Sequence, residues 1–317
     1  MPSDEIPSLI ETCRFLSDPA LDGRSPGSPG HEIARKYLRE MLDRLGFEPL
    51  FNGGWLQSGL SGHTLAAENL AGIKPGRSKR ALLLGAHYDH FQGLPGADDN
   101  AAALSILIEA SRLLSPWNGE HDLILCFFDL EEPPYFLTEE MGSVQFVQNA
   151  PLDLQTVDCA MILDLCGHDV PVPGREDAVF VLGAEHSPDL VGAVSDVESD
   201  TISTYMFANE RIGDLSDHHA FRVRGVPFLF FSCGRWEHYH RPSDTFEKLN
   251  LDKMQGLAEY LADLLQMLDR STVDVRPIDD FWRVEARSLR RLTGFPVPDD
   301  PSAVEGVISG LLAQFAI

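Results

Sequence analysis

Basic residues are scarce in this chain. Of its 317 residues, 25 are Lys or Arg and 49 are Asp or Glu, so the formal net charge is −24. A nucleic-acid-binding protein needs a basic face to displace phosphate counterions, and an anionic membrane surface attracts the same kind of face. The densest basic stretch, residues 283–291, is interleaved with acidic and apolar residues, as on a helix face. We therefore expect no nucleic-acid or membrane partner, and instead a protein that meets cations, metals or small molecules.

Cysteines and long apolar runs are scarce as well. The five cysteines include no C-x-x-C pair, which argues against a zinc ribbon or a redox dithiol and favours free thiols, although a disulfide between two of them stays open. No stretch approaches the roughly 18 apolar residues of a membrane span, and residues 1–6 lack the basic-then-apolar pattern of a secretory signal. We expect a cytoplasmic protein; a secreted protein whose signal had been removed would look the same.

Apolar runs of strand length alternate with helical patterns through most of the chain. The apolar runs cover residues 81–86, 123–128, 160–163 and 226–231, and the helical patterns cover residues 31–45, 100–114, 215–222 and 251–268. Strands that are apolar on both faces and alternate with helices predict an α/β fold, with an open sheet between helices. Residues 272–317 form a separate tail with two further helical patterns, at 279–292 and 302–315. We expect this helical extension to pack on the core or on a partner subunit.

Imidazoles and carboxylates follow every one of these apolar runs. The sequence places His87-Tyr88-Asp89 after the first run, Asp129-Leu130-Glu131-Glu132 after the second and Asp164 after the third, and a loop after the fourth delivers His238-Tyr239-His240. The segment Gly96-Ala97-Asp98-Asp99-Asn100 opens the helical pattern between the first two runs. In open α/β sheets ligands bind beyond the carboxyl ends of the strands, and these are the side chains that bind zinc when thiols are absent. The pattern predicts a metal site at this edge of the sheet.

Each of these segments also has a structural explanation. Asp98 and Asp99 would serve as a helix N-cap, and Ser243-Asp244-Thr245 would cap the last long helix. The pair Glu131 and Glu132 would lie in a solvated loop, although two adjacent carboxylates after a buried run are costly without a cation. Taken jointly, the segments favour a metal centre over a series of unrelated structural roles.

The ordered set of segments resembles the co-catalytic two-zinc aminopeptidases, whose superfamily also contains the glutaminyl-peptide cyclases. The matching segments are Gly85 to His90, Gly96 to Ala101, Phe127 to Glu132, Ile162 to Asp164, Ser216 to Phe221 with Gly225 to Pro227, and Tyr239 to Thr245. The resemblance implies a zinc-exopeptidase fold: three α/β/α layers with a mixed, mostly parallel central sheet. It implies a catalytic domain over residues 1–271, with the extension at 272–317 outside it.

The resemblance also implies the metal ligands. Asp99 would bridge two zinc ions, and the other ligands would be His87 and Asp164 for one ion and Glu132 and His240 for the other. Two zinc ions per chain are expected for a peptidase and one for a cyclase.

Further residues gain catalytic roles from the same resemblance. Glu131 would be the general base and acid, Asp89 would orient His87, and Tyr239 would steady the tetrahedral intermediate. Adjacent residues in an extended segment point opposite ways, so Glu132 can bind metal while Glu131 moves protons. Pro133 favours that extended geometry at Glu132.

One segment departs from the common family pattern. Residues 133–141 form a longer, aromatic-bearing loop between the glutamate pair and Gly142-Ser143. The loop either walls the substrate pocket or tucks its aromatic side chains into the core. For His218 and His219 we expect structural or supporting roles, because the other residues already supply the ligands.

The leading functional hypothesis is a zinc aminopeptidase that hydrolyses the first peptide bond of a substrate with a free N-terminus, using a metal-activated water and the base Glu131. The alternative is a single-zinc glutaminyl-peptide cyclotransferase that forms N-terminal pyroglutamate. Asp99-Asn100-Ala101 and the tyrosine before His240 resemble the peptidase version more closely. A non-catalytic module, a carboxypeptidase and an amidohydrolase are further alternatives. The sequence makes no prediction of the oligomeric state.

Overall fold

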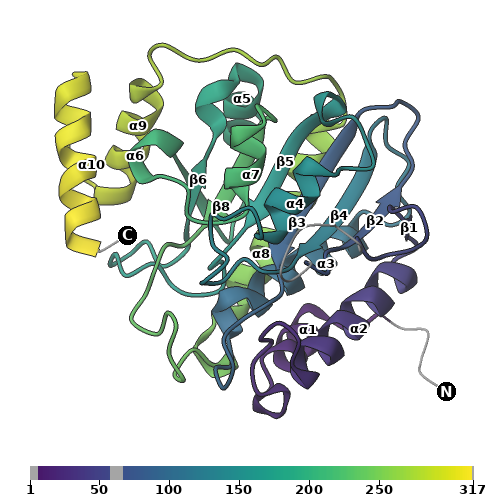
Figure 1. The fold of residues 1–317 in the computed structure, drawn as a ribbon. Coiled ribbons are helices and arrows are strands. Elements are labelled where there is room, and N and C mark those ends of the chain that lie inside the picture. The colour runs from purple at the N-terminus through teal and green to yellow at the C-terminus, as the bar shows by residue number, and fades with distance from the viewer. Residues whose placement is uncertain (1–5, 58–66, 316–317) are drawn as a thin grey trace.

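A computed structural model describes residues 6–57 and 67–315 of the chain, and it is built on one twisted β-sheet (Figure 1). Within the described residues the sheet has eight strands in the order β1-β2-β4-β3-β5-β8-β6-β7. Their bounds are β1 Glu48–Pro49, β2 Leu70–Lys74, β3 Ala81–His87, β4 Asp122–Phe128, β5 Val157–Leu163, β6 Ala178–Leu182, β7 Ser203–Phe207 and β8 Phe228–Ser232. Strands β4, β3, β5 and β8 are parallel neighbours, as are β6 and β7. Antiparallel pairs join β1 to β2, β2 to β4 and β6 to β8, so the sheet is mixed.

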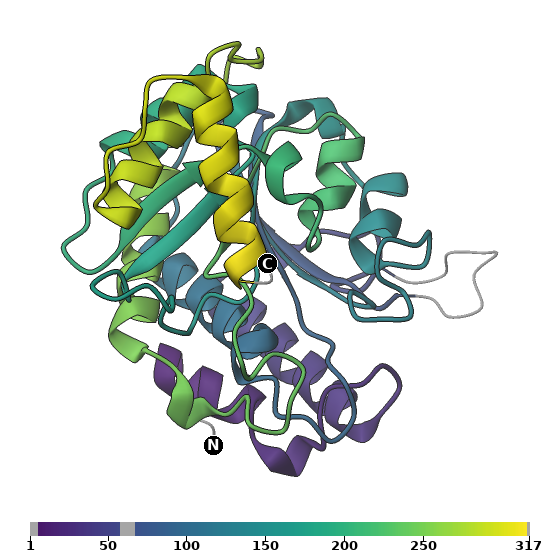
Figure 2. The same cartoon turned by 90° about the vertical axis from the view of Figure 1, so that its left-hand side faces the viewer.

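Helices cover both faces of this sheet (Figures 1 and 2). Their bounds are α1 Leu9–Leu16, α2 Pro29–Arg44, α3 Ala103–Leu113, α4 Gly142–Gln148, α5 Pro188–Asp196, α6 Asn209–Ile212, α7 His218–Val223, α8 Leu251–Leu268, α9 Trp282–Thr293 and α10 Pro301–Phe315. Helix α3 packs against α1 and α8 in one layer, and α4 packs against α7 in the other. The predicted three-layer α/β/α fold with a mixed, mostly parallel sheet is therefore confirmed.

The four predicted apolar runs are the parallel centre of the sheet. They form β3, β4, β5 and β8, and nearly every residue in these strands is buried because helices cover both faces. The outer strands β1, β2, β6 and β7 were not predicted. Strand β1 has two residues, and β2 and β7 mix apolar with polar residues or glycine, so none of these three has a long apolar run. Strand β6 is the apolar run Ala178–Leu182, which the prediction missed.

The C-terminal tail packs along the outer edge of the sheet. Ser288 Oγ in α9 accepts a hydrogen bond from the backbone N–H of Met206, and Glu285 Oε1 accepts one from the N–H of Ala208, each at 3.0 Å. Strand β7 is the last strand of the sheet, so these side chains satisfy amide groups that an open edge would leave unpaired. Helix α10 packs in turn on α9.

The cysteines and the apolar helices were the two other features considered from the composition. All five cysteines are buried and free, so the structure contains no disulfide between them. Among the described helices, none is long and apolar enough to cross a bilayer.

Candidate metal centre

The carboxyl ends of β3 and β5 bring one group of predicted ligands together. His87 is the last residue of β3, Asp164 follows β5 directly, and Asp99 lies in the turn before α3. The Nε2 atom of His87 is 3.3 Å from Asp99 Oδ1 and 3.6 Å from Asp164 Oδ1. All three side chains are buried, and together they form a group that could hold a metal ion.

A second group shares Asp99 with the first. The Nε2 atom of His240 is 3.1 Å from Asp99 Oδ2 and 3.1 Å from Glu132 Oε2. His90 reaches the same two carboxylates, with its Nδ1 atom 2.7 Å from Glu132 Oε1 and 3.9 Å from Asp99 Oδ2. The set His90, Asp99 and Glu132 could also hold a metal ion. Asp99 therefore presents one oxygen to each group, which is the placement that a bridging carboxylate requires.

The donor atoms of this centre have the character of a metal site. Among the described residues, no hydrogen-bond partner reaches the buried Nε2 atoms of His87 and His240 or the Oδ1 atom of Asp164. A buried polar atom without a partner costs about 1–3 kcal/mol, and several clustered carboxylates cost more without a counter-charge. A cation would satisfy both needs, and imidazole nitrogens with carboxylate oxygens are the donor set that zinc prefers. The residues present therefore fit zinc.

Asp89 supports both the first imidazole and the glutamate pair. The Nδ1 atom of His87 is 3.1 Å from the backbone carbonyl oxygen of Asp89 and 3.5 Å from its Oδ1 atom. The two carboxylate oxygens of Asp89 also accept hydrogen bonds from the backbone N–H groups of Glu131 and Glu132, each at 3.1 Å. Asp89 thus holds the segment after β4 in place, a contact that the sequence pattern did not indicate.

Glu131 lies beside the ligands without joining either group. Its Oε2 atom is 3.8 Å from His87 Nε2, and the residue is 5% exposed. Burial raises the pKa of Glu131 well above its ordinary value; His87 opposes this shift, whereas Asp164 and Glu132 add to it. A carboxyl group whose pKa is raised is better suited to accept a proton and then release it.

Three non-glycine residues at the centre have left-handed backbone geometry. Leu130 precedes Glu131, Leu165 follows Asp164, and His240 is itself a predicted ligand; each has φ of 54°. Such a conformation costs about 1–3 kcal/mol in a non-glycine residue and is found mainly where the surrounding structure enforces it for function. No local sequence signal marks these positions.

Asp98 holds the Asp99 turn and does not cap a helix, so the structure contradicts the alternative in which this pair only caps a helix. Asp99 has φ −110° and ψ 83°, which is not helical, and α3 begins only at Ala103. The Asp98 carboxylate accepts a hydrogen bond from the N–H of Gly167 and lies 2.6 Å from Nδ1 of His168. The helix predicted from residue 100 starts late because the turn must present Asp99 to both ligand groups.

Asp244 also has a different role from the predicted helix cap. Its carboxylate accepts hydrogen bonds from the backbone N–H groups of Asp98 at 2.9 Å and Asp99 at 3.2 Å. Helix α8 begins at Leu251, and Asn250 is its N-cap residue. Burial, followed by repulsion from Asp98, raises the pKa of Asp244 to about 8.

A cavity opens beside the centre, and Tyr239 lies in its wall. The cavity has a volume of about 290 Å³ and is also lined by Glu131, Phe136 and Arg235. The Tyr239 ring stacks on His240, with centroids 3.7 Å apart. Burial, strengthened by nearby carboxylates, raises the pKa of Tyr239, so its hydroxyl stays protonated and can donate a hydrogen bond. Phe136 places the long loop at 133–141 in the cavity wall.

The two adjacent histidines of α7 lie outside both ligand groups. His218 is buried with its ring stacked on Phe230 at 4.1 Å between centroids, and burial lowers the pKa of His218 to about 3. His219 Nδ1 is 2.7 Å from Asp214 Oδ2.

The functional candidate that the sequence analysis missed is His90. The sequence feature that could have indicated it is a second imidazole three residues after His87, in the same segment at the end of the strand.

Comparison with known proteins agrees with this geometry. The family model described as Peptidase family M28 matches residues 69–265. The chain belongs to peptidase family M28. The match covers β2 to β8 and most of α8, and it includes every predicted ligand.

The relatives of this M28 chain include one named as a cyclotransferase and one named as an aminopeptidase. The chain is 28% identical to YfbL of Escherichia coli (strain K12) over 215 residues, which is 58% of this chain and 66% of that protein. It is 26% identical to the glutaminyl-peptide cyclotransferase of Bos taurus over 289 residues, covering 77% of this chain and 78% of that protein. It is 23% identical to aminopeptidase YwaD of Bacillus subtilis (strain 168), covering 60% of this chain and 42% of that protein.

Solved structures show the same fold. A Zn-dependent exopeptidase from Parabacteroides distasonis ATCC 8503 superposes with a TM-score of 0.64 at 17% identity, covering 83% of this chain and 99% of that chain. The glutaminyl cyclase of Tannerella forsythia superposes with a TM-score of 0.63 at 18% identity, covering 84% of this chain and 100% of that chain.

Proposed function

We propose that this M28 protein is a metal-dependent aminopeptidase that hydrolyses the first peptide bond of peptides. His87, Asp99 and Asp164 would hold one zinc ion, and Asp99, Glu132 and His240 a second. The observation that carries the proposal is the position of Asp99, which presents Oδ1 to one donor group and Oδ2 to the other. A single-metal enzyme would not need the second group. The names of aminopeptidase YwaD and the Zn-dependent exopeptidase add support.

When bound, the zinc ions would supply Lewis acidity and lower the pKa of a water molecule. Glu131 would accept a proton from the attacking water and pass it to the nitrogen of the departing amine, so that the peptide bond breaks without a charged leaving group. Its burial and its place beside His87 support this role. The Tyr239 hydroxyl would donate a hydrogen bond to the carbonyl oxygen as negative charge develops there.

The alternative activity is a glutaminyl-peptide cyclotransferase, which forms N-terminal pyroglutamate and releases ammonia. It is favoured by the identity to the Bos taurus cyclotransferase over 77% of this chain. A cyclotransferase would work with one zinc ion and would therefore leave one of the two donor groups without a metal.

The deciding experiment compares both reactions on the same preparation. Release of p-nitroaniline from leucine and alanine p-nitroanilides is measured beside ammonia release from a peptide with N-terminal glutamine, and bound zinc is counted per chain. Arylamide cleavage with two zinc ions supports the aminopeptidase. Ammonia release with one zinc ion and no arylamide cleavage refutes it.

The role of Glu131 is tested by Glu131→Gln. The variant should keep both zinc ions and lose turnover by about 10²–10⁴-fold, because general acid–base catalysis contributes that much. The matched control is Glu139→Gln, which alters an exposed glutamate in the same loop and should leave turnover unchanged. Loss of zinc from Glu131→Gln would show that Glu131 and Glu132 have exchanged roles.

A further inference from the structure

The cavity beside the ligands contains a permanently charged cation, Arg235. Among the described residues that line this cavity, Arg235 is the one arginine or lysine. The other ionisable groups in the lining belong to the proposed metal and proton chemistry or to Tyr239; the acidic ones are Asp99, Glu131, Glu132 and Asp164, and the imidazole is that of His240. Neither metal binding nor proton transfer needs the guanidinium. Its place in the wall therefore calls for another role.

No carboxylate of the described part of the chain neutralises this cation. The sequence has 49 acidic and 25 basic side chains, so carboxylates are plentiful. Among the described residues, however, none forms a hydrogen bond or an ion pair with the Arg235 guanidinium. Its recorded contact is with Tyr239, where Cζ lies 5.0 Å from the centroid of the ring, a cation–π contact. The five N–H donors of the guanidinium are therefore available to a ligand.

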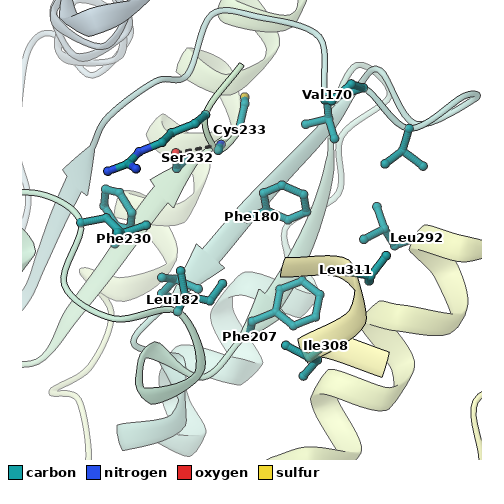
Figure 3. Close-up of a pocket in the computed structure, with 16 residues that line it drawn as sticks. Val170, Phe180, Leu182, Phe207, Phe230, Ser232, Cys233, Leu292, Ile308 and Leu311 are labelled. Atoms are coloured by element: carbon teal, nitrogen blue, oxygen red, sulfur yellow. Dashed lines mark hydrogen bonds between the residues drawn. The ribbon is translucent and has the colours of Figure 1, made fainter. Parts of the chain in front are cut away.

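The chain is anchored on both sides of Arg235. Cys233 directly follows β8 (Figure 3), and its backbone N–H donates a hydrogen bond to the carbonyl oxygen of Leu165 at 2.8 Å. On the other side, the Trp236 ring stacks on the buried ring of His168, with centroids 4.6 Å apart. A side chain whose backbone is already held loses less conformational freedom when it binds a ligand. Arg235 itself is exposed, so a ligand can reach it.

The shape and charge of the guanidinium define the group that it can bind. Its planar fork of N–H donors matches the two oxygens of a carboxylate, whereas an ammonium group would be repelled. The cavity has a volume of about 290 Å³, which is at the small end of ligand sites, and Glu131 lies in the same wall. A carboxylate bound at Arg235 must therefore lie close to the bond that is cleaved.

We propose that Arg235 binds a carboxylate of the substrate, so that peptides with an anionic group next to the scissile bond are preferred. The carboxylate is either the side chain of an acidic residue or the C-terminus of a dipeptide, because both present the same pair of oxygens. This inference rests on the proposed aminopeptidase function and names a substrate class for it. Arg235 would select the substrate and take no part in the bond-breaking step.

The test measures equilibrium binding to the zinc-loaded Glu131→Gln variant, with two pairs of ligands. Alanyl-alanine is compared with its C-terminal amide, and aspartyl-alanine amide is compared with asparaginyl-alanine amide. The carboxylate member of at least one pair should bind at least about fivefold more tightly, as expected of a bidentate ion pair at an exposed site. Preference in the first pair identifies the C-terminus as the bound group, and preference in the second identifies an acidic side chain.

Variants of Arg235 show whether this preference comes from the guanidinium. Arg235→Met should abolish the preference and leave the zinc content unchanged, and Arg235→Lys should keep part of it, because an ammonium retains the charge without the fork. Arg241→Met is the matched control, since Arg241 is exposed in the same loop but does not line the cavity. Structural damage would weaken both members of a pair alike, so the ratio within a pair isolates the role of the charge.

The outcomes separate this inference from the proposed function. Equal binding within both pairs overturns the inference, and so does a preference that survives Arg235→Met, because the carboxylate would then bind elsewhere, for instance to the metal. Either result holds even if arylamides are cleaved. A preference that Arg235→Met abolishes, in a protein that cleaves no arylamide, refutes the proposed function and leaves the assignment of Arg235 standing.

Discussion

Arg24 offers the sharpest test of how the fold supports the metal centre. The residue is 0% exposed, and its guanidinium donates hydrogen bonds to five backbone carbonyl oxygens. The acceptors, with their distances, are Tyr88 (2.9 Å), Leu16 (2.6 Å), Pro95 (2.9 Å), Gly96 (3.0 Å) and Asp99 (3.2 Å). Tyr88 follows the predicted ligand His87, and Asp99 is the carboxylate that both groups share. Arg24 therefore ties the N-terminal segment to the two elements that carry the first ligand group.

The expected cost of Arg24→Met follows from these contacts. A hydrogen bond from a charged donor contributes about 1.5–3 kcal/mol, so five of them sum to roughly 7–15 kcal/mol before the cost of burying the guanidinium is subtracted. That cost is several kcal/mol, and removing one side of a buried charged network usually destabilises a protein by about 3–5 kcal/mol. We expect Arg24→Met to lower the free energy of unfolding by about 3–5 kcal/mol. Arg24→Lys should lower the free energy of unfolding by a smaller amount, because the lysine ammonium keeps the positive charge. It should still lower it, because the three donors of an ammonium lie on one nitrogen and cannot replace five hydrogen bonds.

Two measurements separate stability from metal binding. Urea denaturation of metal-free protein reports the free energy of unfolding, and competition with a zinc-binding dye reports zinc affinity. Zinc affinity of Arg24→Met should fall about 10–100-fold, as is usual when a group that positions ligands is lost. The control is Arg39→Met, an exposed position on α2, which should alter neither quantity. Unchanged unfolding and unchanged zinc affinity in Arg24→Met would refute the reasoning.

Two further predictions concern a buried lysine and the missed histidine. Lys74 is buried without a hydrogen-bond partner among the described residues, and burial lowers its pKa from 10.5 to about 8. Between pH 8 and pH 10.5 the unfolded state binds more protons than the folded state, so the free energy of unfolding should rise with pH. In urea titrations, Lys74→Met should therefore raise the free energy of unfolding by about 1–3 kcal/mol at pH 7. This increase should disappear near pH 10.5, where the lysine loses its charge in both states. A gain independent of pH would contradict this account. His90→Ala should weaken one of the two proposed zinc sites about 10–100-fold and spare the other, because His90 Nδ1 lies 2.7 Å from Glu132 Oε1. Two unchanged affinities in a zinc titration would exclude that role.

The centre of the sheet and the neighbourhood of the site could be predicted from the amino-acid sequence. Apolar runs of strand length that alternate with helical patterns predict buried strands, and the four predicted runs form β3, β4, β5 and β8. The residue that follows such a strand is confined to its carboxyl end, so His87, Glu131, Glu132 and Asp164 had to lie at one edge of the sheet. Their chemistry then indicated a cation.

The contacts that hold the site in place could not be predicted in this way, because they join distant parts of the chain. Asp244 binds the turn at Asp98 and Asp99 from far along the chain, and Arg24 reaches the same turn from the N-terminal segment. Periodicity and local propensity describe a residue's neighbours along the chain, whereas these contacts join segments that meet only after the sheet has formed. For the same reason the sequence pattern assigns no role to His90, because its imidazole and the Glu132 carboxylate come together only in the folded chain.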